Sequence, residues 1–281
     1  MQLQEYIQEI RLTPYPHETV TASPKERDGI CSELLRFLIK ERGMIGAFNY
    51  NYERKRKLVN EYMTERDPHP VPPALLALQD KLLWSETLER GIVDVETFHY
   101  KENVTIFRGD ITKLNADAIV NSTGSSLVGC RIAGHQCIDN IIHLRAGMQM
   151  RMDGFRICGL QGRPESTGDA KITCAYNLPC KYVIHTVGPA AAMGVTEESR
   201  QELRSSYMSC MYLAKEMGLK TIAFNCISTG ILGFPHGEAA EIAVGSVKRW
   251  QLSNPDYNLK VIFDVYSDED IRIYSEIFKF M

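Results

Sequence analysis

The stretch Asp117-Ala118-Ile119-Val120-Asn121 decides the fold of this 281-residue chain. Its apolar, β-branched centre predicts a short buried strand, and the asparagine at its end predicts the start of a loop. Stretches with helical spacing, notably residues 197–217 and 235–250, lie between apolar runs of the same kind, which recur at residues 104–107, 182–184, 221–224 and 261–263. Strands that alternate with helices in this way indicate an α/β architecture around a largely parallel sheet.

Residues 1–90 have a different pattern. A helix is predicted after Pro24, because these apolar side chains fall on one helical face: Ile30, Leu34, Leu35, Leu38 and Ile39. Residues 54–63 predict a second, more polar helix. Pro73 suits the start of a third helix and Gly91 suits its end. We therefore expect a small N-terminal helical domain, or cap, over residues 1–90 and an α/β domain over residues 91–281.

The composition excludes several classes of protein. Lys and Arg total 32 and Asp and Glu total 35, so the net charge of −3 offers no footprint for nucleic acid and no polybasic membrane patch. No apolar run approaches the ~20 residues of a membrane-spanning helix, and the polar N-terminus does not resemble a signal peptide. The eight cysteines are scattered, which is typical of reduced thiols. We expect a cytoplasmic globular protein that binds neither nucleic acid nor membrane.

A candidate metal site lies in the loop Cys130-Arg131-Ile132-Ala133-Gly134-His135-Gln136-Cys137. Two thiolates and an imidazole favour zinc over magnesium or calcium. Three protein ligands, Cys130, His135 and Cys137, leave a fourth position for water or substrate, as in a catalytic zinc site. Two alternatives stay open: a structural zinc, or two buried cysteines with a surface histidine nearby.

Several motifs in one order resemble the macrodomain family. They are Gly109-Asp110-Ile111-Thr112, residues 117–121, Ile184-His185-Thr186-Val187-Gly188-Pro189 and Ile227-Ser228-Thr229-Gly230. The Cys-x4-His-x-Cys loop, followed by Ile138-Asp139-Asn140, is similar to that of the zinc-containing macrodomains, as is the helical extension that includes residues 77–83. The resemblance implies a three-layer α/β sandwich with a largely parallel mixed sheet.

The resemblance also implies an activity: zinc-dependent hydrolysis that removes mono-ADP-ribose from modified protein side chains, through an N- or O-glycosidic bond. Free ADP-ribose would be a ligand. The implied partners are a mono-ADP-ribosylated protein, such as a lipoylated carrier protein, and a sirtuin-like ADP-ribosyltransferase. The rival from another class is a non-catalytic reader that binds ADP-ribose.

For the nucleotide, the resemblance and the residue chemistry agree. The Asp110 carboxylate can accept a hydrogen bond from adenine N6 and the Ile111 amide can donate to the ring, although Asp110 also suits a turn cap beside Thr112. Tyr266 aligns with a family aromatic that packs against adenine. The alternative is that its ring only packs against the protein itself. A glycine-containing loop before a helix suits a diphosphate; its residues are Ser228, Thr229, Gly230, Ile231, Leu232, Gly233 and Phe234.

At the reacting end, Asp139 and His143 stand four residues apart and share one helix face. They match a family pair near the proximal ribose, where Asp139 would orient or deprotonate water and His143 would steady it. The resemblance adds Asn121 as a binding and catalytic residue. The alternative is an Asp favoured by the helix dipole and a satisfied core histidine.

The chain departs from the family at two positions. It reads Val120-Asn121-Ser122-Thr123-Gly124-Ser125 where the family usually reads Val-Asn-Ala-Ala-Asn-Ser. Gly124 therefore replaces an asparagine that contacts the proximal ribose, and the reacting end loses two donors and an acceptor. Arg145 stands where a small residue is common.

Overall fold

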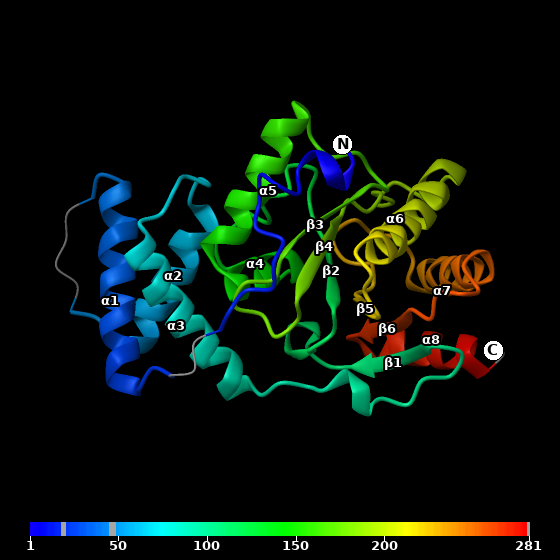
Figure 1. Cartoon of the computed structure of the whole chain (residues 1–281), viewed down its shortest axis with the longest axis horizontal. Coiled ribbons are helices and arrows are strands. Elements are labelled where there is room, and N and C mark those ends of the chain that lie inside the picture. Colours follow the sequence, from blue (N-terminus) through cyan, green and yellow to red (C-terminus); the bar gives the residue numbers. More distant parts are fainter. Residues whose placement is uncertain (18–20, 45–48, 280–281) are drawn as a thin grey trace.

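A computed structural model of the protein describes residues 1–17, 21–44 and 49–279. Within them, six strands form one sheet in the order β1-β6-β5-β2-β4-β3 (Figure 1). The strands are β1 Val104–Arg108, β2 Ala118–Ser122, β3 Ala170–Cys174, β4 Tyr182–Thr186, β5 Thr221–Phe224 and β6 Lys260–Val265. All pairs are parallel except β3 with β4, where Ile172 lies opposite Ile184. The expected largely parallel, mixed sheet is confirmed; the edge strand β3 is an addition that the sequence pattern did not predict.

Helices cover both faces of the sheet, which confirms the three-layer sandwich. One face packs against α6 Glu197–Glu216, α7 His236–Ser253 and α8 Asp268–Lys279 through side chains such as Val120, Phe224 and Phe263. The preceding residue of each strand points to the opposite face, where Ile119, Ala223 and Ile262 pack against α4 Ile138–Ala146. Strands buried on both faces explain the continuous apolar runs in the sequence.

The three predicted N-terminal helices are α1 Pro24–Glu41, α2 Tyr52–Glu65 and α3 Pro73–Arg90. They share an apolar cluster of their own, which Met148 of α5 Met148–Gln161 joins. Ser23 caps α1 by accepting from the Glu26 amide, and Gly91, with a φ of 80°, ends α3. The helices lie at one end of the molecule, beside α4 (Figure 1). No described helix is both long enough and apolar enough to cross a membrane.

The first part of the N-terminal segment, residues 1–10, packs on the α/β part of the chain, and its second part contacts α3, where the Tyr15 hydroxyl donates to Asp80 at 2.6 Å and the His17 ring stacks on Trp84. Leu3, Tyr6 and Ile10 are buried in the core of the α/β part. The Ile172 amide of β3 donates to the Tyr6 hydroxyl oxygen at 3.0 Å. The N-terminal segment thus stabilises the sheet near its edge strand. The division of the chain at residue 90 stays a prediction.

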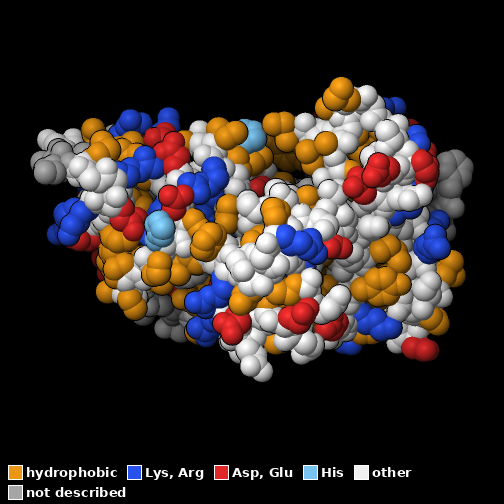
Figure 2. Space-filling model, turned by 90° about the horizontal axis from the view of Figure 1, so that it is seen from above, with side chains coloured by type: hydrophobic (Ala, Val, Ile, Leu, Met, Phe, Trp, Pro, Cys, Tyr) orange, Lys and Arg blue, Asp and Glu red, His pale blue; other side chains and the backbone are white. Residues whose placement is uncertain are grey.

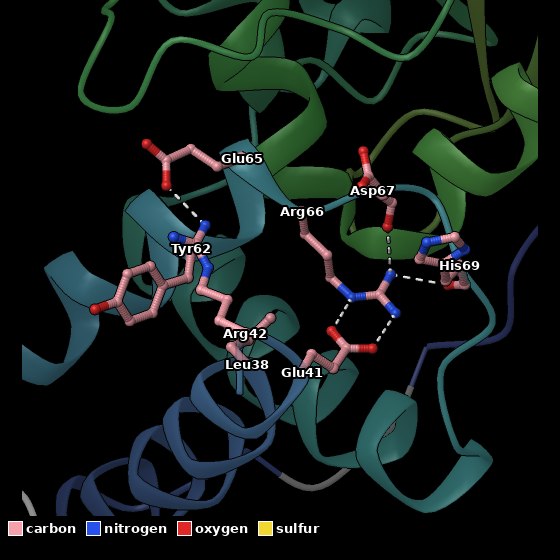
Figure 3. A pocket seen from close by; sticks show the side chains of 8 residues that line it. All are labelled: Leu38, Glu41, Arg42, Tyr62, Glu65, Arg66, Asp67 and His69. Carbon is pink, nitrogen blue, oxygen red and sulfur yellow. Dashed lines mark hydrogen bonds and ion pairs between the residues drawn. The ribbon is translucent and has the colours of Figure 1, made fainter. Parts of the chain in front are cut away.

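The charged groups at the surface are of mixed sign. Basic and acidic side chains are interspersed over the face seen in Figure 2. Figure 3 shows a cavity of about 520 Å³ beside the ends of α1 and α2, in which Arg66 pairs with Glu41 at 2.6 Å and Arg42 pairs with Glu65 at 2.7 Å. Because the charged side chains of this cavity pair with one another, we infer that they connect α1 to α2 and do not bind a ligand.

Candidate active site

The candidate site lies at the carboxyl ends of β2, β5 and β6, where ligands of α/β sheets bind. Several buried polar atoms there have no hydrogen-bond partner among the described residues: Asn121 Oδ1, Asn225 Oδ1, Ser228 Oγ, Asp264 Oδ1 and both ring nitrogens of His143. A buried polar group without a partner is costly and rare in folded proteins. Their concentration at one edge of the sheet indicates that a polar ligand completes them.

Asn121 lies at the centre of the predicted reacting end. It is fully buried at the end of β2, and its Nδ2 donates to Asp139 Oδ1 at 2.8 Å. The same Nδ2 lies 3.2 Å from Nδ1 of His185, whose Nε2 lies 2.9 Å from the Thr173 hydroxyl. Since an amide nitrogen only donates, His185 Nδ1 accepts and the proton resides on Nε2. Burial lowers the pKa of His185 to about 3, so the ring is neutral and orients Asn121.

Asp139 and His143 share a face of α4, as predicted. Asp139 Oδ1 lies 3.5 Å from His143 Nε2, beyond a good hydrogen bond. Burial raises the pKa of Asp139, and hydrogen bonds from Asn121 and Thr123 offset part of that rise. Burial, with the nearby Arg151 cation, lowers the pKa of His143 well below its usual value. His143 is therefore a neutral ring with two unused nitrogens, which argues against the alternative of a satisfied core histidine.

Cys130, His135 and Cys137 come together, as expected of a metal site. Their donor atoms all lie within 4.8 Å of one another, and Cys130 Sγ is 3.3 Å from His135 Nδ1. For bonds of about 2.3 Å to sulfur and about 2.0 Å to nitrogen, a tetrahedral zinc separates such a pair by about 3.5 Å. The three side chains are half-buried. The donor set and its geometry fit a zinc ion with one open position.

Neighbouring side chains hold the backbone of this metal loop, residues 130–137. Arg151 of α5 donates to the Cys130 carbonyl at 3.0 Å, and Asn140 donates to the His135 carbonyl at 2.8 Å. The Asn140 oxygen in turn accepts from Thr64 of α2 at 3.1 Å. The helices of the N-terminal region therefore help to position the metal loop.

At the predicted nucleotide end, Asp110 caps the short turn Ile111–Lys113. Its Oδ1 accepts from the Thr112 amide at 3.1 Å and from the Thr112 hydroxyl at 2.6 Å, and its Oδ2 pairs with Arg145. Burial opposes ionisation, but these hydrogen bonds hold the pKa of Asp110 below its usual value. The turn-cap alternative is thus correct in part. A carboxylate has about four acceptor positions, so one remains for an adenine amino group. Ile111 itself is buried in the core.

The predicted diphosphate loop follows β5 and turns through two positive φ angles, 66° at Ser228 and 71° at Gly233. The amides of Gly233 and Phe234 donate to carbonyls inside the loop, and the Thr229 amide donates to the Cys226 carbonyl just before it. Phe234 is also buried in the core. Within the described residues, no acceptor pairs with the amides of Gly230, Ile231 and Leu232. These three amides are therefore the backbone donors of the loop that remain for an anion.

Tyr266 follows β6 and is 86% exposed, which leaves its ring free to cover a ligand. Gly124 lies in the exposed loop after β2. Its φ is not in the left-handed region, and a side-chain Cβ built there would meet no atom within 4 Å. The loop therefore has both the backbone conformation and the space for the asparagine that the family usually places there.

Sequence reasoning missed two residues of the site. His185 belongs to the motif Ile184–Pro189, and a histidine inside a buried strand was the feature that could have identified it as a site residue. Asp264 of β6 is buried two residues before Tyr266. Burial and the neighbouring Asp110 raise the pKa of Asp264 to about 8, although the Gly109 amide offsets part of this rise. A carboxylate in an apolar strand was its only signal.

A six-stranded mixed sheet between helices, with buried polar atoms gathered at its carboxyl edge, is the architecture of a macrodomain. The Macro domain family matches residues 120–243, and the chain belongs to this family. It is 43% identical over 238 residues, 84% of this chain and 87% of its relative, to the protein-ADP-ribose hydrolase of Staphylococcus aureus strain MRSA252. It is 40% identical over 218 residues, 75% of this chain and 64% of its relative, to the ADP-ribose glycohydrolase MACROD1 of Mus musculus. A solved Trypanosoma brucei macrodomain in complex with ADP-ribose has a TM-score of 0.60 and 25% identity, covering 75% of this chain and 92% of that one.

Proposed function

We propose that this protein hydrolyses the bond between mono-ADP-ribose and a protein side chain, and that it uses a zinc ion to do so. The row of unpartnered buried polar atoms at the carboxyl edge of the sheet carries the proposal, because they need a polar ligand. The names of the Staphylococcus aureus and Mus musculus relatives support hydrolysis of ADP-ribose linkages. The bound ligand of the Trypanosoma brucei structure supports ADP-ribose as the group recognised.

In this proposal the cleft holds ADP-ribose from end to end. Asp110 and the exposed ring of Tyr266 hold the adenine. The free amides of residues 230–232 and the orphan Ser228 hydroxyl bind the diphosphate. The proximal ribose then reaches Asn121 and Asp139, beside the metal loop.

Cys130, His135 and Cys137 would hold the zinc ion, which supplies Lewis acidity at the reacting end when bound. Asn121 fixes Asp139 through one carboxylate oxygen, and the other positions of the carboxylate remain for water. In the hydrolytic step the water oxygen bonds to the anomeric carbon and the bond to the protein side chain breaks. The water proton passes to Asp139 and then to the leaving group. Neutral His143 can accept a hydrogen bond from water or from a ribose hydroxyl.

One observation favours a second candidate function, that of a reader. Gly124 leaves open the place where an asparagine would orient the proximal ribose. A reader would bind ADP-ribose firmly without releasing it from protein.

The test follows the loss of labelled ADP-ribose from a mono-ADP-ribosylated protein. We expect release by the parent and at least about hundredfold slower release by Asp139→Asn. Asp268→Asn, an exposed carboxylate that pairs with Arg108, serves as the matched control and should behave as the parent does. Firm binding of ADP-ribose without release by the parent would favour the reader. A lipoylated carrier protein as substrate, and a sirtuin-like ADP-ribosyltransferase that modifies it, are the partners that we propose to test first.

A further inference from the structure

A second crevice lies on the outer side of α4, away from the sheet. It has a volume of about 380 Å³ and is lined by α2, by the end of α3 and by α4. Figure 1 shows α2 and α3 beside α4. Gly134, His135 and Gln136 of the metal loop also line it. The crevice is therefore continuous with the loop that flanks the reacting end.

The crevice carries more positive than negative charge. Its lining includes the cations Arg56, Lys57, Arg90 and Arg145, but only two acids, Glu61 and Glu86. Arg56 is satisfied by Glu86 at 2.6 and 2.8 Å, and Arg145 by Asp110. Lys57 reaches Glu61 only at 3.9 Å, with 66% of its side chain exposed. Within residues 1–17, 21–44 and 49–279, Lys57 and Arg90 thus have no acidic group within 3.5 Å.

Arg90 is the strongest indication of an anionic ligand. Its Nε is buried and has no hydrogen-bond partner within the described residues, while its Nη2 donates to the Thr87 hydroxyl at 2.8 Å. Burial, together with the nearby Arg145 cation, lowers the pKa of Arg90, although the side chain stays charged at neutral pH. A half-buried guanidinium that has an unused donor and lies near another guanidinium, here that of Arg145, favours binding of a carboxylate or a phosphate.

We propose that this crevice binds an acidic segment of the ADP-ribosylated protein, close to the modified side chain. The inference rests on the proposed function, which places the scissile bond beside the metal loop. ADP-ribose would occupy the inner side of α4, so the attached protein must leave the cleft past residues 134–136. A crevice that begins at those residues and contains the weakly paired Lys57 and the incompletely bonded Arg90 is complementary to carboxylate side chains of the departing chain.

The experiment uses two synthetic peptides that carry one ADP-ribose through the same linkage, flanked either by glutamates or by glutamines. Hydrolysis (kcat and KM) and peptide affinity by fluorescence anisotropy are measured for the parent, Arg90→Gln and Lys57→Gln. Arg249→Gln, an exposed arginine on α7, is the matched control. Calorimetry with free ADP-ribose shows whether the nucleotide cleft is intact.

We expect the parent to prefer the glutamate peptide by roughly five- to tenfold, mainly in KM and affinity. Either substitution should remove most of this preference, Arg249→Gln should retain it, and free ADP-ribose should bind all variants equally. Added salt should weaken the preference. Equal use of both peptides by the parent, or a preference unchanged in both crevice variants, would overturn the proposal. If the parent hydrolyses neither peptide, the proposed activity fails, and the anisotropy comparison still decides whether the crevice binds acidic sequence.

Discussion

Two parts of the candidate site, the turn at Asp110 and the surroundings of Asn121 and His143, differ in how their polar groups are satisfied. At the nucleotide end, Asp110 is held by Thr112 and Arg145 before any ligand arrives. At the predicted reacting end, Asn121 Oδ1 and the ring nitrogens of His143 are buried and have no hydrogen-bond partner in the described part of the chain. They lie near the half-buried Cys130, His135 and Cys137. From this comparison we expect the affinity for ADP-ribose and the rate of hydrolysis to depend on separate residues. Substitutions at one end should therefore change binding, and substitutions at the other should change turnover.

Loss of the metal should have the largest effect. We expect about one zinc ion per chain after purification without added metal, and less in Cys137→Ala. Hydrolysis should fall at least about hundredfold in that variant or after chelation, because several kcal/mol of transition-state stabilisation are lost. Elemental analysis and label release measure both effects.

Cys158→Ala, which removes a half-buried thiol outside the metal loop, is the control. Equal zinc in the parent and in Cys137→Ala would remove Cys137 from the ligand set. Active protein that contains no zinc would show that the loop is structural.

Asp139→Asn should lower kcat by about 10²–10⁴ and leave the affinity for free ADP-ribose within a fewfold of the parent. The substitution keeps an acceptor for Asn121 but removes the proton acceptor. Steady-state kinetics and calorimetry separate the two quantities. A large loss of affinity with little loss of kcat would break the comparison between the two ends.

Asp264→Asn tests the buried acid at the nucleotide end. The pKa of Asp264 is about 8 in the folded protein and about 3.8 in the unfolded chain, so unfolding releases a proton between these values. Stability contributed by this neutral acid therefore falls as pH rises from about 4 to 8. Compared with the parent, Asp264→Asn should leave the free energy of unfolding nearly unchanged at pH 4 and raise it above pH 8, by roughly 2–5 kcal/mol. Urea unfolding across this pH range measures it, and an equal effect at both ends of the range would contradict it.

The sequence predicted the parallel strands and the three N-terminal helices because local periodicity and end signals determine them. It did not predict β3, since Ala170-Lys171-Ile172-Thr173-Cys174 becomes a strand through its pairing with β4 and through the Tyr6 contact. It did not predict α5, whose two interior glycines, Gly154 and Gly159, weaken a helical pattern. At Gly154 a side chain would lie 2.0 Å from the Leu127 carbonyl, so close packing requires this glycine.

In the candidate site too, contacts between residues close in the sequence could be predicted and contacts between distant residues could not. Asp139 with His143 and the Cys130–His135–Cys137 group could be predicted, because short spacing brings them together. The pair of Arg145 with Asp110 and the support of the metal loop by Thr64 could not, because each joins residues far apart in the chain. Arg145, an unusual residue at its position, thus has a structural partner.

Asp110→Ala should weaken binding of free ADP-ribose by roughly 1.5–3 kcal/mol, about ten- to more than a hundredfold, without slowing turnover at saturation. The adenine loses its charged acceptor, and Arg145 loses its partner. Calorimetric titration of a variant with an unchanged melting profile measures the effect. An unchanged dissociation constant would place the adenine elsewhere.

Gly124→Asn should have the smallest effect, an increase in kcat of roughly threefold with little change in affinity. The backbone and the open space at this position accept the side chain, which would orient the proximal ribose. Gly134→Asn, in the metal loop at a φ of 75°, is a contrasting control because strain is expected there. Tighter binding of ADP-ribose without an increase in kcat would contradict this prediction and show that the side chain at position 124 affects affinity.

The most direct test of the account compares release and binding in the parent and in Cys130→Ala. Free ADP-ribose released from a mono-ADP-ribosylated protein is quantified, and the affinity for free ADP-ribose is measured on the same samples. The account predicts release by the parent, none above background by Cys130→Ala, and affinities within about threefold of each other. A parent that binds ADP-ribose firmly but releases no more than Cys130→Ala would contradict the account and make this protein a reader.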